Sequence, residues 1–279
     1  MKNTIVSANW LKENLHSKDL VIIDASPEGN VSGLASEYDG VQITGARPVS
    51  LKKDLSKKDS LFPNTLPDPA DLQKTARRHG INKTSVVVVY DNLGIYTAPR
   101  VWWLFITMGL TECYVLDGGL PEWVKAKGET ESRKLYSGKK GNFEANFNTK
   151  GWRGLKSIEN NIKLKEEQVV DARSQGRFKG TAPEPRAGLS SGSISGSKNL
   201  PFKEVLKNGK LKTKNELKTI FTQMNLKNSP IVFSCGSGLT ACITLLAASQ
   251  VLQNTVSVYD GSWTEWAQLR PELIKKQKK

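Results

Sequence analysis

A cysteine followed by small residues is the strongest chemical signal in this sequence. Cys235 ends the run "IVFS" at 231–234, and "GSGLT" separates it from an apolar stretch with helical character. Glycines let backbone N–H groups turn toward a common centre, and a helix that begins near Thr240 adds the positive end of its dipole. Both features favour an anion, so we predict a thiolate nucleophile at Cys235. The loop predicted to surround the sulfur comprises Gly236, Ser237, Gly238, Leu239 and Thr240.

The residues available to this cysteine limit the chemistry. The chain has two histidines, His16 and His79, and no CxxC motif, which disfavours both imidazole acid–base catalysis and a zinc site. A thiolate without a histidine suits attack on a soft sulfur atom, and sulfur transfer through a persulfide is such a reaction. A cysteine phosphatase needs an arginine six residues after the nucleophile, where this chain has Ala241. Phosphatase chemistry is therefore a remote alternative, and we expect neither a metal nor a cofactor.

Two arginines offer a second half of the site. Arg177 and Arg186 lie in "GRFKGTAPEPR" at 176–186, a segment too irregular to be a surface helix. Arginines on a positioned loop are well suited to binding carboxylates. An ion pair at the surface or between domains is the alternative for each arginine alone. We predict that the pair binds an anionic substrate.

The elements that must position these residues occur twice. "LVIIDAS" at 20–26 resembles "QVVDARS" at 168–174, "VVVVYDNLGIYTA" at 86–98 resembles "PIVFSCGSGLTA" at 230–241, and "YVLDGGLPEWV" at 114–124 resembles "SVYDGSWTEWA" at 257–267. The constant order and nearly constant offset indicate an internal duplication. Each copy alternates short β-branched runs with helical patterns, which predicts an α/β fold with a parallel sheet flanked by helices in each of two tandem domains.

Only one of the two copies carries the cysteine. Ligands of parallel α/β domains gather at the carboxyl ends of the strands, the place of Cys235 in the second copy and of Asp91 in the first. We therefore expect an inactive domain over 1–130, a polar linker over 131–155 and a catalytic domain over 156–279.

The charge and hydrophobicity of the sequence limit the kinds of partner that we expect the protein to bind. The chain has 41 Lys and Arg against 27 Asp and Glu, a net charge of +14, but the lysines are scattered and no nucleic-acid recognition motif accompanies them. No apolar run reaches the ~18 residues that span a bilayer, and the N-terminus has no signal-peptide pattern. We expect a cytoplasmic monomer that binds a small anionic substrate and neither membrane nor nucleic acid.

The motifs resemble the tandem rhodanese family of sulfurtransferases over nearly the whole chain. The most specific are "APRVWW" at 98–103, "LDGGLPEW" at 116–123, the arginine segment and "CGSGLTA" at 235–241. The resemblance implies that Cys235 forms a persulfide and that Ser237 helps to polarise or protonate the substrate. It also implies that Arg177 and Arg186 bind the carboxylate and keto oxygens of the sulfur donor.

The loop resembles that of the branch of this family that uses 3-mercaptopyruvate. This branch typically has neutral residues after the cysteine, as Gly236 and Ser237 are here, whereas thiosulfate enzymes usually have Arg and Lys. The resemblance implies transfer of sulfur to cyanide, a small thiol or a thioredoxin-like protein, with release of pyruvate. Thiosulfate as the donor is the first alternative. A persulfide carrier that works only when docked to a partner is the second.

The sequence departs from the family at several positions. Gln42 and Ser193 stand where "HIPGA" has its histidine, and Lys52 and Asn64 stand where many mercaptopyruvate enzymes have an acidic residue and a histidine. A serine–histidine–aspartate relay therefore cannot form, so slower turnover, another proton source or another donor is expected. Cys242, seven residues after Cys235, is interpreted as a buried helix residue rather than a second redox thiol.

Overall fold

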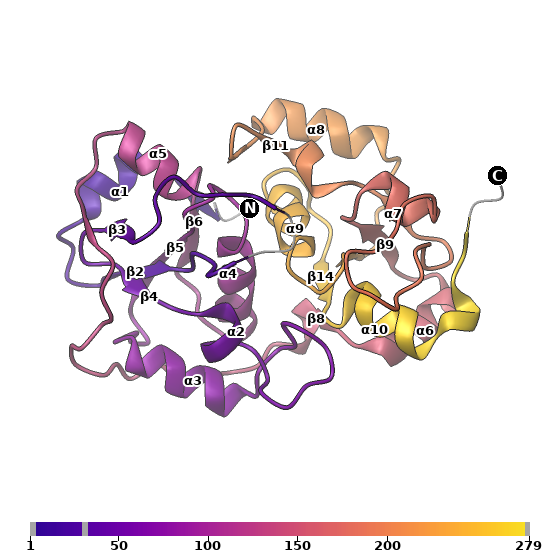
Figure 1. Cartoon of the computed structure of the whole chain (residues 1–279), viewed down its shortest axis with the longest axis horizontal. Helices are drawn as coiled ribbons and strands as arrows, with labels where there is room; N and C mark the ends of the chain where they lie inside the picture. The colour runs from indigo at the N-terminus through magenta and orange to yellow at the C-terminus, as the bar shows by residue number, and fades with distance from the viewer. Residues whose placement is uncertain (1–3, 30–32, 277–279) are drawn as a thin grey trace.

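Two parallel sheets form the framework of the protein (Figure 1). The computed structural model describes residues 4–29 and 33–276. The first sheet has the strand order β1-β6-β5-β2-β4 and the second the order β10-β9-β13-β14-β8. Every pairing within these two sheets is parallel. The predicted fold, two α/β units each with a parallel sheet and flanking helices, is confirmed.

The first half contains residues up to the start of the polar segment near 130. Its sheet strands are β1 (Ile5–Val6), β2 (Leu20–Asp24), β4 (Arg47–Pro48), β5 (Val86–Tyr90) and β6 (Cys113–Leu116). Its helices are α1 (Ala8–Asn14), α2 (Leu51–Asp54), α3 (Pro69–Arg78), α4 (Ala98–Thr107) and α5 (Gly119–Lys125). A separate antiparallel pair joins β3 (Val41–Ile43) to β7 (Thr130–Ser132).

The second half repeats this plan. Its sheet strands are β8 (Trp152–Arg153), β9 (Gln168–Asp171), β10 (Lys198–Asn199), β13 (Ile231–Ser234) and β14 (Val256–Tyr259). Its helices are α6 (Leu155–Leu164), α7 (Gln175–Lys179), α8 (Lys214–Gln223), α9 (Ala241–Ser249) and α10 (Ser262–Leu269). A hairpin of β11 (Leu206–Lys207) and β12 (Lys210–Leu211) and the short 3-10 helices η1 (Thr149–Gly151), η2 (Phe202–Val205) and η3 (Pro271–Leu273) complete the described elements.

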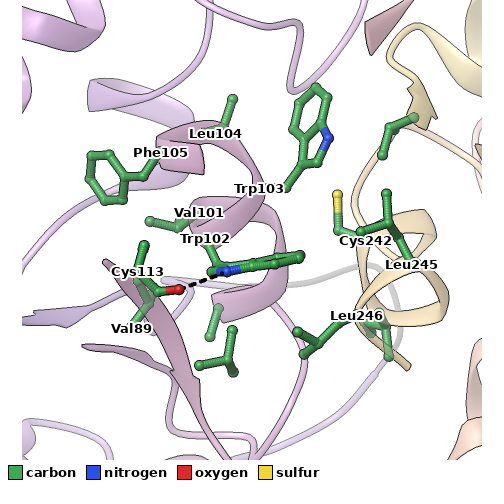
Figure 2. Close-up of a cluster of buried hydrophobic side chains, with 14 of the residues drawn as sticks. Val89, Val101, Trp102, Trp103, Leu104, Phe105, Cys113, Cys242, Leu245 and Leu246 are labelled. Atoms are coloured by element: carbon green, nitrogen blue, oxygen red, sulfur yellow. Dashed lines mark hydrogen bonds between the residues drawn. The ribbon is translucent and has the colours of Figure 1, made fainter. Parts of the chain in front are cut away.

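The two halves share one hydrophobic core. Helix α9 is buried from Ala241 to Ala248, so it has no polar face to present to water. It packs against α4 of the first half, and Figure 2 shows Trp102 and Trp103 of α4 facing the α9 side of this core. Apolar burial is non-directional and scales with the area removed from water, so this shared core holds the halves in a single body.

Cys242 belongs to this shared core. Its side chain is fully buried among the residues drawn in Figure 2, and its Sγ lies 3.3 Å from the carbonyl oxygen of Gly238. Burial raises the pKa of the Cys242 thiol to about 12. The interpretation of Cys242 as a buried helix residue is confirmed.

The polar segment after residue 130 is tied to both halves. Its strand β7 pairs with β3, Phe143 is buried, and the amides of Asn146 and Asn148 donate to carbonyls at the end of α4. The chain then supplies the edge strand β8 of the second sheet. No helix between residues 4 and 276, the masked 30–32 excepted, is long and apolar enough to cross a membrane.

Candidate active site

Cys235 lies at the carboxyl end of the second sheet, directly after β13 and between β9 and β14. The start of α10 holds its loop in place. The hydroxyl of Ser262 accepts from the amides of Cys235 and Gly238 at 3.2 and 3.1 Å, and the amide of Trp263 donates to the carbonyl of Cys235 at 2.9 Å. The start of α10, which follows the neighbouring strand β14, therefore fixes the geometry of the cysteine loop, as expected for a turn at this edge of a parallel sheet.

These bonds correct one part of the predicted amide cradle. The amide of Gly238 points to Ser262 and is not available to the sulfur. Gly238 instead supplies a turn with φ of 73°, and a Cβ there would lie 2.7 Å from the carbonyl oxygen of Asp260. Four other amides of the loop have no backbone or side-chain acceptor within the described ranges: those of Gly236, Ser237, Leu239 and Thr240. They are free to bond an anion.

The corresponding loop of the first half has its cradle filled. The carboxylate of Asp91 is fully buried at the end of β5. Its two oxygens accept hydrogen bonds, at 2.8 to 3.0 Å, from the amides of Leu93, Tyr96, Thr97 and Ala98. Burial raises the pKa of Asp91, while these four amides oppose that shift. In the first half the chain's own carboxyl group thus occupies the space that a substrate anion would need.

The two predicted arginines converge on the cysteine loop. A Cβ built on Gly236 would lie 3.0 Å from Arg177 Nη2 and 3.7 Å from Arg186 Nη1. Both guanidinium groups thus flank the residue that follows Cys235, although they belong to a segment about 50 residues earlier in the chain. The predicted loop is correct for Arg186 but wrong for Arg177, which lies on the short helix α7. A side chain at position 236 would therefore press on the end of the Arg177 guanidinium and shift it by a few tenths of an ångström.

Arg177 and Arg186 differ in whether a carboxylate already neutralises their charge. Arg177 Nη2 lies 2.5 Å from Glu184 Oε2, and the other oxygen of Glu184 accepts from Arg173 Nη1 at 2.7 Å. Arg186 contacts only neutral groups, the hydroxyls of Ser237 at 3.3 Å and Thr264 at 3.5 Å. No carboxylate among the described side chains is paired with Arg186, so its charge is available to an anionic ligand.

The first half also reaches into this site. Asn64 Nδ2 donates to the carbonyl oxygen of Ser237 at 3.2 Å and to its Oγ at 3.1 Å. Asn64, which stands at the position of the missing relay histidine, thus contacts Ser237 of the cysteine loop, a contact that the sequence did not predict. Lys52 is exposed on α2, and no hydrogen bond in the described chain joins it to Asn64 or Ser237.

A buried arginine that the sequence did not identify as a site residue supports this contact. Arg100 of α4 is fully buried, and its Nη2 binds Asp260 Oδ1 at 2.6 Å and the carbonyl oxygen of Asn64 at 2.5 Å. Its Nη1 donates to the carbonyl of Gly238 at 3.3 Å. Burial alone would lower the pKa of Arg100, but the Asp260 carboxylate raises it above its ordinary value. A charged residue within the apolar run "APRVWW" was the available signal.

The sulfur is covered in this structure. Cys235 is 1% exposed, and a cavity of about 710 Å³ lined by α4, β6 and 146–150 contains none of the predicted site residues. A sulfur donor can therefore reach Cys235 only after the groups that cover it move.

Comparison with protein families agrees with the internal duplication. Residues 7–126 and 155–269 each match the Rhodanese-like domain. The chain belongs to the rhodanese-like family. This rhodanese-like protein is 35% identical to the 3-mercaptopyruvate sulfurtransferase of Escherichia coli K12, over 94% of each chain. It is 37% identical to thiosulfate/3-mercaptopyruvate sulfurtransferase 1, mitochondrial, of Arabidopsis thaliana, over 96% of this chain and 77% of the relative.

Solved structures agree with these relatives. The rhodanese-like chain superposes with a TM-score of 0.82 and 32% identity on SseA from Escherichia coli, a structure described with the catalytic mechanism of 3-mercaptopyruvate sulfotransferases, covering 94% of this chain and 99% of the other. The mouse thiosulfate sulfurtransferase is 35% identical over 96% of this chain. The predicted sulfurtransferase family is confirmed.

The two departures in the "HIPGA" motif have structural partners. Gln42 is buried, and its Nε2 donates to the carbonyl of Ala46 at 3.0 Å and to Glu131 Oε1 at 2.9 Å. Ser193 forms a backbone bridge with Lys275. Neither residue bonds to the cysteine loop in the part of the chain described, so both changes act on the framework.

Proposed function

We propose that this rhodanese-like protein moves sulfur from 3-mercaptopyruvate to a thiophilic acceptor through a persulfide on Cys235. The observation that carries the proposal is the convergence of Arg177 and Arg186 on Gly236, next to the cysteine. The names of the E. coli and plant relatives support the same donor.

Each group of the donor has a partner in the proposed complex. The unpaired guanidinium of Arg186 binds the carboxylate, since a charge-assisted pair is the strongest contact the site offers. Arg177, held by Glu184, faces the keto oxygen. The open amides of Gly236, Ser237, Leu239 and Thr240 stabilise the thiolate and then the persulfide.

The first half-reaction follows from these contacts. The Cys235 thiolate attacks the thiol sulfur of mercaptopyruvate, the S–S bond forms and the carbon–sulfur bond breaks. The electron pair of that bond becomes the enolate of pyruvate, whose oxygen carries the developing charge. The proton that the donor thiol gives up, as its sulfur becomes the outer sulfur of the persulfide, protonates the enolate carbon. This gives pyruvate and leaves Cys235 as a persulfide anion. Hydrogen-bond donors near that oxygen lower the barrier most.

The second half-reaction returns the enzyme to its starting state. Cyanide, a small thiol or a thioredoxin-like protein attacks the outer sulfur of the persulfide, the S–S bond breaks and its electron pair returns to Cys235 as the thiolate. The net charge of +14 favours the approach of anionic donors and acceptors. We further propose that the protein acts as a cytoplasmic monomer without nucleic-acid or membrane partners.

Thiosulfate is the alternative donor, because one relative is named for both donors and another for thiosulfate alone. The neutral loop favours mercaptopyruvate, since no lysine or arginine follows Cys235 to pair with a second negative charge. Steady-state kinetics with both donors test this choice. A higher kcat/KM with thiosulfate would contradict it.

Mass spectrometry tests the nucleophile. After mercaptopyruvate is added to the full chain, we expect a gain of one sulfur, about 32 Da, on the wild type and none on Cys235→Ser. Turnover with cyanide and no protein partner separates an enzyme from the persulfide-carrier alternative. A carrier would gain the sulfur but release it only when a partner protein is added.

A further inference from the structure

The hydroxyl of Ser237 is bonded by two groups that can only donate. Asn64 Nδ2 lies 3.1 Å from Ser237 Oγ, and Arg186 Nη2 lies 3.3 Å from it. A guanidinium has no acceptor. The amide of Asn64 is oriented by a second contact, since Nδ2 also lies 3.2 Å from the carbonyl oxygen of Ser237, which can only accept. The nitrogen rather than the oxygen of the Asn64 amide therefore faces Ser237.

This arrangement leaves the serine proton unused. A hydroxyl has one proton to donate and two lone pairs that accept. The two donors occupy both lone pairs, and no acceptor for the proton of Ser237 lies within hydrogen-bonding distance among residues 4–29 and 33–276. The Ser237 side chain is buried, which makes an unmade hydrogen bond expensive. The site therefore presents a donor that lacks its acceptor.

Hydrogen bonds of the segment around Asn64 hold its side-chain nitrogen in the direction of Ser237. Its carbonyl oxygen accepts from the buried Arg100, and the amide of Leu66 donates to Asp260 Oδ2 at 2.8 Å. The backbone of Asn64 has φ of 59°, a left-handed conformation that asparagine tolerates better than most residues. The first half thus carries Asn64 to the serine on a segment anchored at both sides.

We infer that Asn64 is a positioning residue that keeps the Ser237 proton free to bond the oxygen of the sulfur donor on which negative charge develops. This rests on the proposed function, in which that oxygen is the enolate oxygen of pyruvate. Ser237 stabilises the enolate as a neutral donor and neither gains nor loses a proton. The first half, whose own anion cradle is filled by Asp91, thus contributes this amide to the site of the second half.

Single-turnover release of pyruvate from the full chain tests the inference. Ser237→Ala is expected to lower the rate at saturating mercaptopyruvate about 100-fold. Asn64→Gly removes the amide, relieves the left-handed backbone and is expected to lower the rate about tenfold, with the donor concentration at half-maximal rate nearly unchanged. Because Asn64 acts through the serine, the double variant should be no slower than Ser237→Ala. A double variant slowed by the product of the two effects would overturn the inference.

Two further variants distinguish the amide from the loop that carries it. Thr65→Ala is the matched control, because among the residues that the structure describes the Thr65 hydroxyl bonds only Phe62 and Ser60 of the same loop. We therefore expect the wild-type rate. Asn64→Asp keeps the shape but replaces the donor by an acceptor that captures the serine proton, so it should be slower than Asn64→Gly. Wild-type rates in Asn64→Gly or Asn64→Asp, or equal losses in Thr65→Ala and Asn64→Gly, would refute the role of Asn64.

The two proposals fail in different ways. If the wild type releases no pyruvate and gains no sulfur on Cys235, the proposed function falls and the donor-directed role of Asn64 falls with it. If the wild type does both, the variants above decide on Asn64 alone. Melting temperatures of all variants show whether a lost rate reflects lost folding.

Discussion

Arg100 and Asp260 form a buried ion pair, with 2.6 Å between Nη2 and Oδ1, that joins the two halves directly behind the cysteine loop. Their side chains are 0% and 6% exposed, so water cannot take the place of either partner when the other is removed. The same guanidinium binds the carbonyls of Asn64 and Gly238. Arg100 of the first half thus holds the cysteine loop, the Asp260 carboxylate that follows β14 and the segment that reaches Ser237.

Breaking this pair is expected to destabilise the protein strongly. Arg100→Met leaves the buried Asp260 carboxylate without its partner and should lower the free energy of unfolding by about 3–5 kcal/mol. Denaturant unfolding measures the change. The control is Arg78→Ala, which breaks the pair with Asp54, where Arg78 is 55% exposed, and should cost less than about 1 kcal/mol. Equal losses in the two variants would contradict the proposed importance of Arg100.

The two substrate arginines should separate into different phenotypes. Arg186→Ala removes the unpaired cation and is expected to lower kcat/KM for mercaptopyruvate about 10–100-fold with little change in melting temperature, because its present partners are two hydroxyls. Arg177→Ala should lower kcat/KM as well, but also the melting temperature, because it leaves the buried Glu184 with only Arg173.

Conservative replacement refines this test. Arg186→Lys keeps the charge but loses the planar fork, so it should recover part of the activity that Arg186→Ala loses. Full activity in Arg186→Ala would show that the carboxylate binds elsewhere.

The glycine after the nucleophile should tolerate no side chain. Gly236→Ala would place its Cβ 3.0 Å from Arg177 Nη2 and so move the guanidinium, and we expect a loss of about 10–100-fold in kcat/KM. Gly29→Ala is the matched control, since no atom of the described residues lies within 4 Å of a Cβ at that position. Wild-type kinetics in Gly236→Ala would mean that the arginines need not lie where the structure places them.

Acid should weaken the framework through Glu131. Hydrogen bonds from Lys134, the amide of Gly45 and Gln42 lower the pKa of Glu131 to about 2, whereas an unfolded glutamate titrates near about 4.3. A folded pKa below the unfolded value adds stability above about pH 4.3, and that stability is lost as the pH falls toward 2. The free energy of unfolding should therefore drop over this interval.

Removing the carboxylate tests the assignment. Glu131→Gln should reduce the drop in the free energy of unfolding between pH 5 and 2. Glu13→Gln, an exposed change of the same charge on α1, should leave the drop as it is. An unchanged acid dependence in Glu131→Gln would exclude the contacts with Gln42 and Lys134 as its cause.

The sequence by itself determined the doubled α/β plan and the place of Cys235 at the end of a strand. Both follow from local patterns: β-branched runs of strand length, the turn "CGSG" after one of them, and an apolar helix beyond it. The arginine segment was also visible, but the predicted loop holds only for Arg186, because the residues around Arg177 form the short helix α7 that ends at Gly180. Strand ends of a parallel sheet meet at one edge whatever the intervening sequence, so these predictions needed no long-range contact.

Only the tertiary structure decided how the site is completed. Asn64 and Ser237 are 173 residues apart, and Arg100 and Asp260 are 160 apart, so no periodicity along the chain relates them. The structure also assigned the Gly238 amide to Ser262 instead of the sulfur, because the start of α10 packs under the loop. Such contacts arise from the packing of two halves around one core, where direction and distance are set by neighbours that a local pattern does not encode.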